Sequence, residues 1–382
     1  MKFDFLIIGH TIEVTDCNNP LSNVIGNAIR AVGVAKELAI LNLSVALVVD
    51  YRISLPTGLS HENITLIDRS RYKSVASSAS LVLISTTKPS VLISEHGIDL
   101  LALSNCNLVL LSCFNDNAIS RDGQDLYNIF KLITVNNYEQ KLIIEQRGVV
   151  PKVLNLDFGV NELAQSLSHT EPGKIKALWV GCIRSREVLK KIVKFANVFS
   201  DVEVNIVSRL VFDKHTVSTA PGNKVFGTVI NLLEESLSSP EALKKLSDWI
   251  GHELPLNINF LGAAESNYQE ILLSHDIGLD FCESVYQQHD NTKILDYLSS
   301  GMFVFTENYA PSFRYVEEFD SGYCLPDFEE NNLIYGLEHY KKCSSKYWRN
   351  NLIDLVYQKY GWKAQTRKLI SALQTIDESK FS

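Results

Sequence analysis

The 382-residue sequence contains no long hydrophobic run. Every apolar stretch falls short of the roughly 18–20 residues that a helix needs to span a bilayer, so no transmembrane segment is predicted. The first apolar run, Phe3–Ile8, is very short and contains Asp4. This pattern indicates a buried first strand rather than a signal peptide. We therefore expect a cytoplasmic protein.

Long basic runs and paired cysteines are absent as well. Thirty-six Lys and Arg residues against 44 Asp and Glu residues give a net charge of −8. That charge argues against nucleic acid as a partner, because nonspecific binding rests on many phosphate contacts. The seven cysteines include no Cys-x-x-Cys pair, which predicts free thiols and no structural zinc. No His–carboxylate group has metal-ligand spacing, so no metal site is predicted.

The chain does contain an alternation of short apolar segments with segments of helical periodicity. In the first half, helices are predicted over Asn23–Leu41 and Val91–Leu103. The predicted strands are Phe3–Ile8, Ser44–Val49, Leu81–Ile84, Asn107–Leu111 and Leu132–Val135. Strands that alternate with helices predict an α/β fold with a parallel, doubly wound sheet.

The alternation restarts after a polar linker at residues 165–174, and the segment Phe212–Leu254 interrupts it as an elaborated connection. The length of the chain suits two domains. We expect an N-terminal Rossmann-like domain over residues 1–165, a second one over 166–345, and a helical tail over 346–382 that packs back toward the first. The predicted elements are strands at Lys152–Leu156, Lys176–Val180, Val202–Val207, Asn257–Leu261, 277–281 and 302–306, and helices at Arg186–Phe199, Asn267–Ser274 and Asn291–Ser300.

A polar corner follows the apolar strand 277–281. In a parallel sheet, the loop after a strand and the start of the next helix form the usual ligand crevice. The helix predicted here ends at Gly301 and places Lys293 and Asp296 on one face. A purely structural connection would not need this polarity, so the corner is a candidate binding site. Its polar residues are Gln288, His289, Asp290, Asn291, Thr292, Lys293 and Asp296.

The segment Lys293–Val304 resembles the donor-site signature Lys-x-x-Glu-Tyr-Leu-Ala-x-Gly-x-Pro-Val of GT-B-fold glycosyltransferases, especially the retaining, nucleotide-sugar-dependent family-four group. Four further stretches resemble that family in the same order. They are Leu154–Asn161, Leu178–Arg186, Asn259–Ile277 and Tyr360–Thr366. The resemblance covers about residues 150–375 and is only topological over 1–150. It implies two doubly wound Rossmann-like domains facing across a cleft.

The resemblance also implies an activity. A GT-B enzyme of this group moves a sugar from a nucleotide-sugar, here UDP- or GDP-linked, to an acceptor hydroxyl without a metal or other cofactor. The acceptor would be a carbohydrate or glycoconjugate, as in bacterial polysaccharide synthesis. Asp296 stands where the family has its ribose-binding Glu, and one carboxylate can accept hydrogen bonds from both ribose hydroxyls.

The other donor contacts follow from the same comparison. The diphosphate needs fixed positive charge as the glycosidic bond breaks, and Lys293 with Arg184 or Arg186 would supply it. The two arginines cannot be separated by sequence. Asn291, Thr292 and Gly262 complete the predicted donor site.

Catalysis is the part of the resemblance that this sequence does not fully match. Gln288 stands where many members carry a Glu eight residues before the ribose residue. A neutral amide binds hydroxyls but supplies no negative charge. We predict His289, Gln288 and Asp290 as the catalytic group. The missing carboxylate leaves two alternatives: a non-catalytic GT-B protein that binds a nucleotide-sugar or supports a partner, and a sugar-nucleotide epimerase.

The acceptor side is predicted in the first half of the chain. Polar loops follow two of its strands, and in a doubly wound sheet both face the ligand edge. An Asp, Glu or His there would be the general base of an inverting transferase, whereas in a retaining one it would only orient the acceptor. The predicted acceptor-side residues are His10, Asp16, Asn115 and Asp116.

Overall fold

The computed structural model describes most of the chain, in segments separated by short gaps. The described residues are 2–9, 26–49, 61–86, 89–113, 123–161, 174–181, 183, 186–208, 210–212, 215–217, 224–226, 229–231, 239–262, 268–281, 293–308 and 313–375. The chain divides into two compact units. Unit 1 comprises Met1–Asn161 and Lys359–Ser382, and unit 2 comprises Glu162–Gln358.

Unit 1 is built on a seven-stranded sheet in which every pair of neighbouring strands is parallel. Its order is β3-β2-β1-β4-β5-β6-β7, so the direction of winding reverses between β1 and β4. This is the doubly wound sheet that the alternation predicts. The strands are β1 (Phe3–Gly9), β2 (Val45–Val49), β3 (Ile64–Asp68), β4 (Ala79–Ser85), β5 (Leu108–Cys113), β6 (Leu132–Val135) and β7 (Lys152–Asn155).

The helices of unit 1 include three that were not predicted, at Tyr72–Ala76, Gln124–Asn128 and Tyr138–Gln146, and one that ends earlier than predicted. The helix expected over Val91–Leu103 ends at His96, because Gly97 adopts a left-handed φ of 63°, and Leu101–Leu103 forms a separate 3-10 turn. Strand β3 was not predicted, because the strand is short and most of its five residues are half-buried. The helices are α1 (Gly26–Ile40), α2 (Tyr72–Ala76), α3 (Pro89–His96), α5 (Gln124–Asn128), α6 (Tyr138–Gln146) and α14 (Trp362–Gln374).

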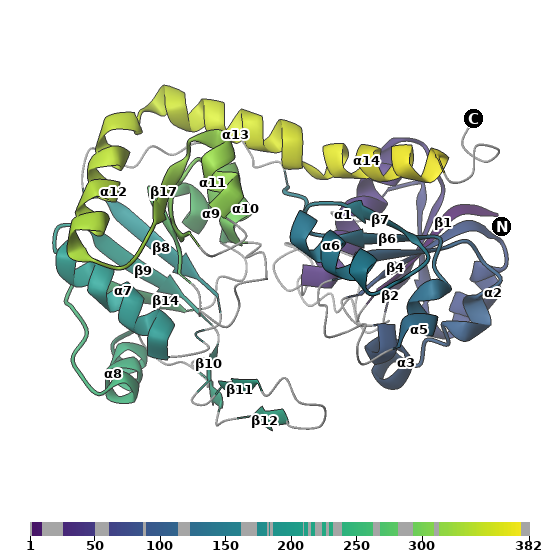
Figure 1. The fold of residues 1–382 in the computed structure, drawn as a ribbon, viewed down its shortest axis with the longest axis horizontal. Helices are drawn as coiled ribbons and strands as arrows, with labels where there is room; N and C mark the ends of the chain where they lie inside the picture. Colours follow the sequence, from purple (N-terminus) through teal and green to yellow (C-terminus); the bar gives the residue numbers. More distant parts are fainter. Residues whose placement is uncertain are drawn as a thin grey trace. The chain divides into compact units, whose positions relative to one another are not determined.

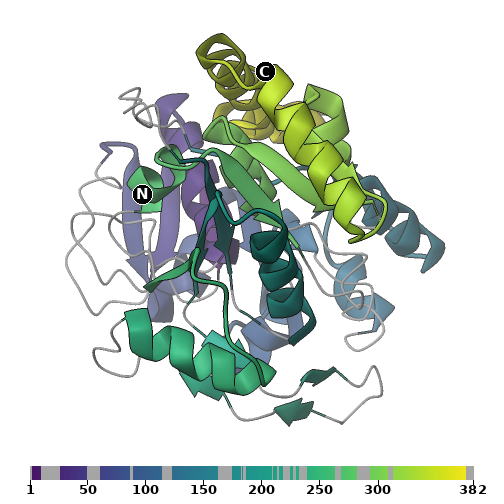
Figure 2. The ribbon, with the colours of Figure 1, turned by 90° about the vertical axis from the view of Figure 1, so that its left-hand side faces the viewer.

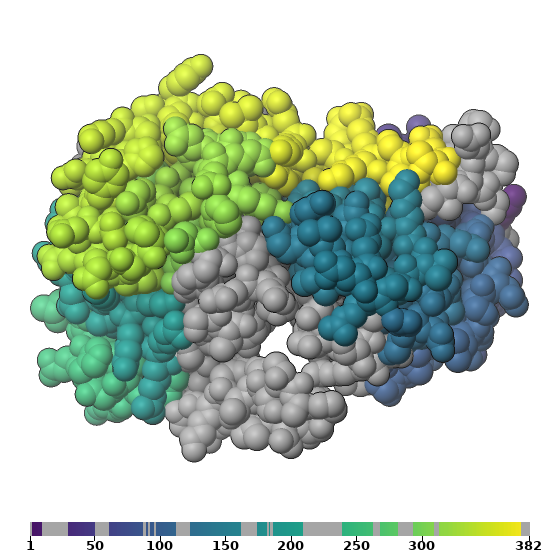
Figure 3. Space-filling model, in the orientation of Figure 1, coloured from purple at the N-terminus to yellow at the C-terminus, as the bar shows by residue number. Residues whose placement is uncertain are grey.

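The C-terminal helix α14 completes the core of unit 1. Its Trp362 ring lies in a slot between two glycines: a Cβ at Gly33 of α1 would come within 2.4 Å of the ring, and one at Gly159 within 2.2 Å. Backbone bonds from Val160 to Tyr360 and from Trp362 to Val160 fix the entry to the helix. The opposite face of α14 is solvent-exposed and is yellow in Figure 3.

Unit 2 has a six-stranded, all-parallel sheet of order β14-β9-β8-β15-β16-β17, whose winding reverses between β8 and β15. Aromatic and aliphatic side chains of α7, α8 and α12 form the core on one face. Helices α9, α10 and α11 belong to the other face (Figures 1 and 2). The strands are β8 (Lys176–Val180), β9 (Glu203–Val207), β14 (Ile258–Gly262), β15 (Ile277–Asp280), β16 (Phe303–Glu307) and β17 (Gly322–Leu325).

The tail expected to be helical over residues 346–382 contains two helices. Gly361, which adopts an extended ψ of 147°, precedes α14; α13 is counted with unit 2 up to Gln358, and α14 is counted with unit 1. The helices are α7 (Arg186–Val198), α8 (Ser239–Ile250), α9 (Tyr268–Leu273), α10 (Lys293–Ser299), α11 (Phe313–Phe319), α12 (Glu330–Cys343) and α13 (Lys346–Tyr360).

The elaborated connection predicted over Phe212–Leu254 contains two small antiparallel pairs outside the main sheet. Strands β10 (Leu210–Phe212) and β13 (Val229–Asn231) pair with each other, as do β11 (His215–Val217) and β12 (Lys224–Phe226) (Figure 1). Helix α8 closes the connection and packs on α7 and β14. Among the described residues, no helix is both long and apolar enough to cross a membrane.

Candidate functional site

The candidate site lies at the carboxyl edge of the unit 2 sheet, where the winding reverses. Strand β8 ends at Val180 and β15 ends at Asp280, and these two strands are neighbours in the sheet. In open α/β sheets this reversal point is where ligands bind. The first turn of α10, which carries Lys293 and Asp296, follows β15 in the chain. The geometry therefore places the two predicted donor residues at this edge.

Tyr297 fixes α10 against the sheet. Its ring lies directly on Gly278 of β15, where a Cβ would come within 2.4 Å, and its hydroxyl accepts a 2.9 Å hydrogen bond from the backbone N–H of Val180. Burial raises the pKa of Tyr297 well above its ordinary value, so the hydroxyl stays protonated. The sequence signal for this packing is a glycine inside an apolar strand, which marks a close approach of another element.

Lys293 is held at the ends of β8 and β15. Its ammonium lies 4.7 Å from the centroid of the Trp179 ring, 3.8 Å from a carboxylate oxygen of Asp280, and 3.4 Å from the carbonyl oxygen of Phe281. Asp280 is fully buried and also accepts a 2.9 Å hydrogen bond from Thr306. Lys293 thus places positive charge at the predicted edge and at the same time neutralises a buried carboxylate.

Asp296 is joined to a residue that sequence reasoning missed. The Tyr268 hydroxyl, at the first position of α9, donates a 2.9 Å hydrogen bond to Oδ2 of Asp296. Desolvation raises the pKa of Asp296 to about 6, and this hydrogen bond opposes the rise. Among the described residues, no cation lies within ion-pair distance of this carboxylate. A desolvated carboxylate at a ligand edge is a candidate binding group.

Two other predicted donor residues lie along the same edge. Arg186 is exposed at the start of α7, and its guanidinium lies 5.8 Å from the centroid of the Trp249 ring of α8. Gly262 ends β14 with a left-handed φ of 77°, and a Cβ there would meet no described atom within 4 Å. The carbonyl of Gly262 accepts a hydrogen bond from Ser208 at 3.0 Å.

The remaining predicted site residues lie outside the described residues. They are the catalytic group His289, Gln288 and Asp290, the donor residues Arg184, Asn291 and Thr292, and the acceptor-side residues His10, Asp16, Asn115 and Asp116. The structure thus places Asp296, Lys293, Arg186 and Gly262 at one sheet edge. Within the described segments, no three His, Cys, Asp or Glu side chains are grouped so that they could hold a metal ion.

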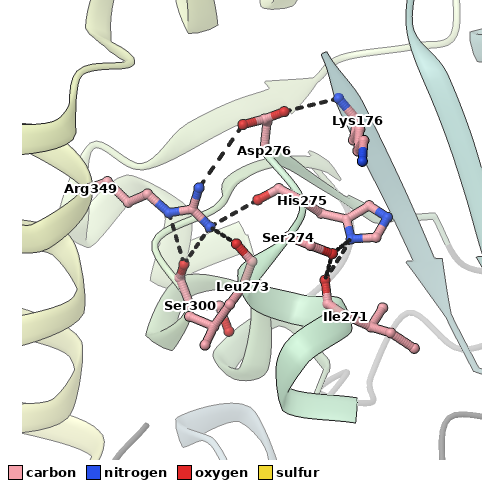
Figure 4. A network of polar contacts seen from close by, with 8 residues as sticks. All are labelled: Lys176, Ile271, Leu273, Ser274, His275, Asp276, Ser300 and Arg349. Atoms are coloured by element: carbon pink, nitrogen blue, oxygen red, sulfur yellow. Dashed lines mark hydrogen bonds and ion pairs between the residues drawn. The ribbon is translucent and has the colours of Figure 1, made fainter. Parts of the chain in front are cut away.

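A second polar cluster lies at the opposite, amino edge of the same sheet (Figure 4). Arg349 of α13 donates to the carbonyl oxygens of Leu273, His275 and Ser300 at 3.0–3.2 Å. Leu273 is the last residue of α9 and Ser300 follows the last residue of α10, so one guanidinium caps two helices. Asp276 lies 4.0 Å from the same guanidinium and accepts a hydrogen bond from the backbone N–H of Lys176 at 2.9 Å.

The histidine of this second cluster is committed to the fold. His275 is 3% exposed, and its ring nitrogens lie 3.0 Å from the Asn205 amide and 2.6 Å from the Ile271 carbonyl oxygen. Burial lowers the pKa of His275, so the ring is neutral near pH 7. The cluster joins elements through backbone groups and is structural.

Comparison with solved structures identifies the type of fold. No protein-family model matches the chain, and no curated protein matches its sequence. Solved structures do match over nearly the whole length. A glycosyltransferase from Rickettsia africae has a TM-score of 0.64 at 12% identity, with 99% of each chain covered. Anabaena HepE in complex with UDP and glucose has 0.61 at 13%, with 98% of this chain and all of that chain covered.

A third neighbour, the sucrose-phosphate synthase of Thermosynechococcus elongatus, has a TM-score of 0.61 at 11% identity, with 98% of this chain and 99% of that chain covered. At these identities the likeness establishes architecture. The chain has the GT-B fold, with two parallel-sheet units of seven and six strands. The resemblance to GT-B glycosyltransferases, first drawn from short motifs, is confirmed at the level of the fold.

Proposed function

We propose that this chain is a glycosyltransferase that moves a sugar from a nucleotide-sugar to an acceptor hydroxyl. The observation that carries the proposal is Asp296, a desolvated carboxylate at the winding reversal of the second GT-B unit. A carboxylate at that position can accept hydrogen bonds from two ribose hydroxyls. Lys293, with Arg184 or Arg186, would supply positive charge to the diphosphate.

The donor is proposed to be UDP-linked, with a GDP-linked sugar next. Support comes from HepE, whose structures contain UDP, UDP with glucose, and UDP-glucose. The transfer is proposed to retain the anomeric configuration, and to proceed without a metal or other cofactor. The acceptor is proposed to be a carbohydrate or glycoconjugate. The free thiols of Cys106, Cys324 and Cys343 suit the reducing cytoplasm, which we propose as the compartment.

A thermal-shift panel of UDP-, GDP-, ADP- and CMP-sugars tests the donor class, because a ligand that binds the folded state raises its melting temperature. The wild-type chain should respond to one of the first two. Asp296→Ala should remove most of that response. The matched control is Asp201→Ala, an exposed carboxylate before β9 at the amino edge of the same sheet, which should leave the response unchanged. An equal response in Asp296→Ala and wild type would overturn the assignment.

A non-catalytic, nucleotide-sugar-binding protein is the second candidate, and Gln288 in place of a carboxylate favours it. The two candidates differ in turnover. A transferase releases free nucleoside diphosphate from the sugar donor in the presence of an acceptor mixture, whereas a binding protein does not. Conversion of the donor without any acceptor would instead indicate an epimerase.

A further inference from the structure

Tyr268 and Asp296 form a pair with an unusual hydrogen-bonding capacity. The Tyr268 hydroxyl uses its one hydrogen on Oδ2 of Asp296, at 2.9 Å. Its oxygen retains lone pairs and can therefore still accept a hydrogen bond, as can the carboxylate, which has several acceptor positions. The pair thus presents two neighbouring oxygens that accept, and no hydrogen to donate. Its natural ligand is a group with two adjacent O–H donors.

The pair is also held rigidly. Tyr268 begins α9 and Asp296 lies in the first turn of α10, so the two oxygens come from separate helices. Arg349 ties the far ends of the same two helices together through the carbonyls of Leu273 and Ser300. Tyr297 fixes α10 on the sheet through Gly278 and Val180. The spacing between the phenol and the carboxylate is therefore set by the fold before a ligand arrives.

We propose that Tyr268 and Asp296 together bind the vicinal diol of the donor ribose, one hydroxyl to the phenol oxygen and the other to the carboxylate. The inference rests on the proposed function, since it names a second contact in the same donor site. Aspartate is one methylene shorter than glutamate and reaches less far from α10. The tyrosine oxygen, 2.9 Å from Oδ2 of Asp296, supplies a further acceptor next to the shorter side chain.

Binding of the wild-type chain to a nucleoside diphosphate (UDP, GDP or ADP, whichever binds) and to its 2′-deoxy and 3′-deoxy analogues tests this division. Wild type should bind both analogues about five- to tenfold more weakly than the parent, the cost of one hydrogen bond each. Tyr268→Phe should lose the discrimination against one analogue, and Asp296→Asn against the other. Tyr340→Phe is the matched control, because Tyr340 lies in α12 beside Phe303 at the amino edge of the sheet.

The pH dependence of nucleotide affinity distinguishes a binding role of Tyr268 from a purely structural one. Among the described residues, the titratable groups that interact with Asp296 are Tyr268 from α9 and Tyr297, its neighbour on α10. The hydrogen bond from Tyr268 lowers the pKa of Asp296, so its removal raises that pKa above about 6. As the pH is lowered, Tyr268→Phe should therefore lose its affinity for the diphosphate at a higher pH than wild type does. Tyr340→Phe should lose it at the same pH as wild type.

The outcomes separate the two proposals. If both variants discriminate against both analogues as wild type does, the pair is not the diol site. If Asp296→Asn weakens binding but Tyr268→Phe changes neither discrimination nor the pH profile, the donor site stands and the inference about Tyr268 fails. If wild type binds no nucleoside diphosphate, both fail. Either variant alone carries the test if the other does not fold, because each predicts loss at a different hydroxyl.

Discussion

Helices α9 and α10 of unit 2 are joined at both ends, and the two joints are chemically different. At their C-terminal ends, Arg349 binds backbone carbonyls of both helices and Asp276 balances its charge. At their N-terminal ends, Tyr268 binds a carboxylate that has no described cation beside it. One joint satisfies its polar groups within the chain. The other contains the desolvated carboxylate that is proposed to bind the donor.

The largest expected effect is at the Arg349 joint. Arg349→Ala leaves three carbonyls and Asp276 without their cation, and should lower the free energy of unfolding by about 3 kcal/mol. Urea unfolding measures this. Arg349→Lys keeps the charge but not the planar fork, and should recover part of the loss. A loss below about 1 kcal/mol for the alanine variant would contradict the structural role.

Lys293 is the next test, because it belongs to the ligand edge but neutralises Asp280. Lys293→Met should destabilise the fold by about 2 kcal/mol, since it leaves a fully buried carboxylate with only part of its partners. Lys293→Arg, which keeps the charge and the contact with Trp179, is the control. Unchanged stability in the methionine variant would mean that the ammonium is free for the donor phosphates.

Asp296→Asn should change stability in the opposite direction. The pKa of Asp296 is 3.8 in the unfolded chain and about 6 in the folded one, so only the folded state holds this proton between those values. The contribution of Asp296 to stability therefore falls as pH rises from about 4 to 6. Asparagine does not titrate, so the stability of Asp296→Asn lacks this decrease with pH. After allowance for partial exposure, the variant should be about 1–2 kcal/mol more stable than wild type at pH 7.5. At pH 4 the two stabilities should be similar.

Chemical denaturation at the two pH values measures the difference. Tyr268 can still donate to the asparagine side-chain oxygen, so the comparison isolates the charge. A variant less stable than wild type at pH 7.5 would show that the carboxylate contributes to folding, and the contrast between the two joints would disappear.

The smallest expected effect is that of Tyr340→Phe. This hydroxyl lies near Asp276 and Arg349 of the amino-edge joint, and burial raises its pKa to about 12, so it carries no charge near pH 7. Its removal should lower stability by about 0.5–1 kcal/mol, the net value of one hydrogen bond, and leave nucleotide affinity unchanged. A calorimetric scan measures the melting temperature. A decrease as large as that of Arg349→Ala would show that Tyr340 of α12 is part of the amino-edge joint.

The sequence predicted the layered fold well, because apolar runs and helical periodicity report burial directly. It failed where a single backbone torsion decides, because the helix predicted over Val91–Leu103 ends before Gly97, which adopts a left-handed φ. Strand β17 was missed because Gly322–Leu325 is short and only its last residue is fully buried.

At the site, Lys293 and Asp296 were found through their spacing after a strand. Tyr268 was not, because its pairing with Asp296 spans 28 residues and depends on how α9 and α10 pack. Asp280 looked like an ordinary strand end, and nothing in its neighbourhood in the chain indicated Thr306 or Lys293 as partners. Long-range pairs of this kind become visible only when the topology is known.

The slot that holds Trp362 has a consequence for synthesis of the protein. Unit 1 is made first by the ribosome, yet its core includes Trp362, Leu369 and Leu373, which are made after all of unit 2. Domains generally fold as units during translation. Here all the residues of unit 2 have been synthesised before the last residues of unit 1. The packing of Trp362 against Gly33 and Gly159 can therefore form only after α14 has been made.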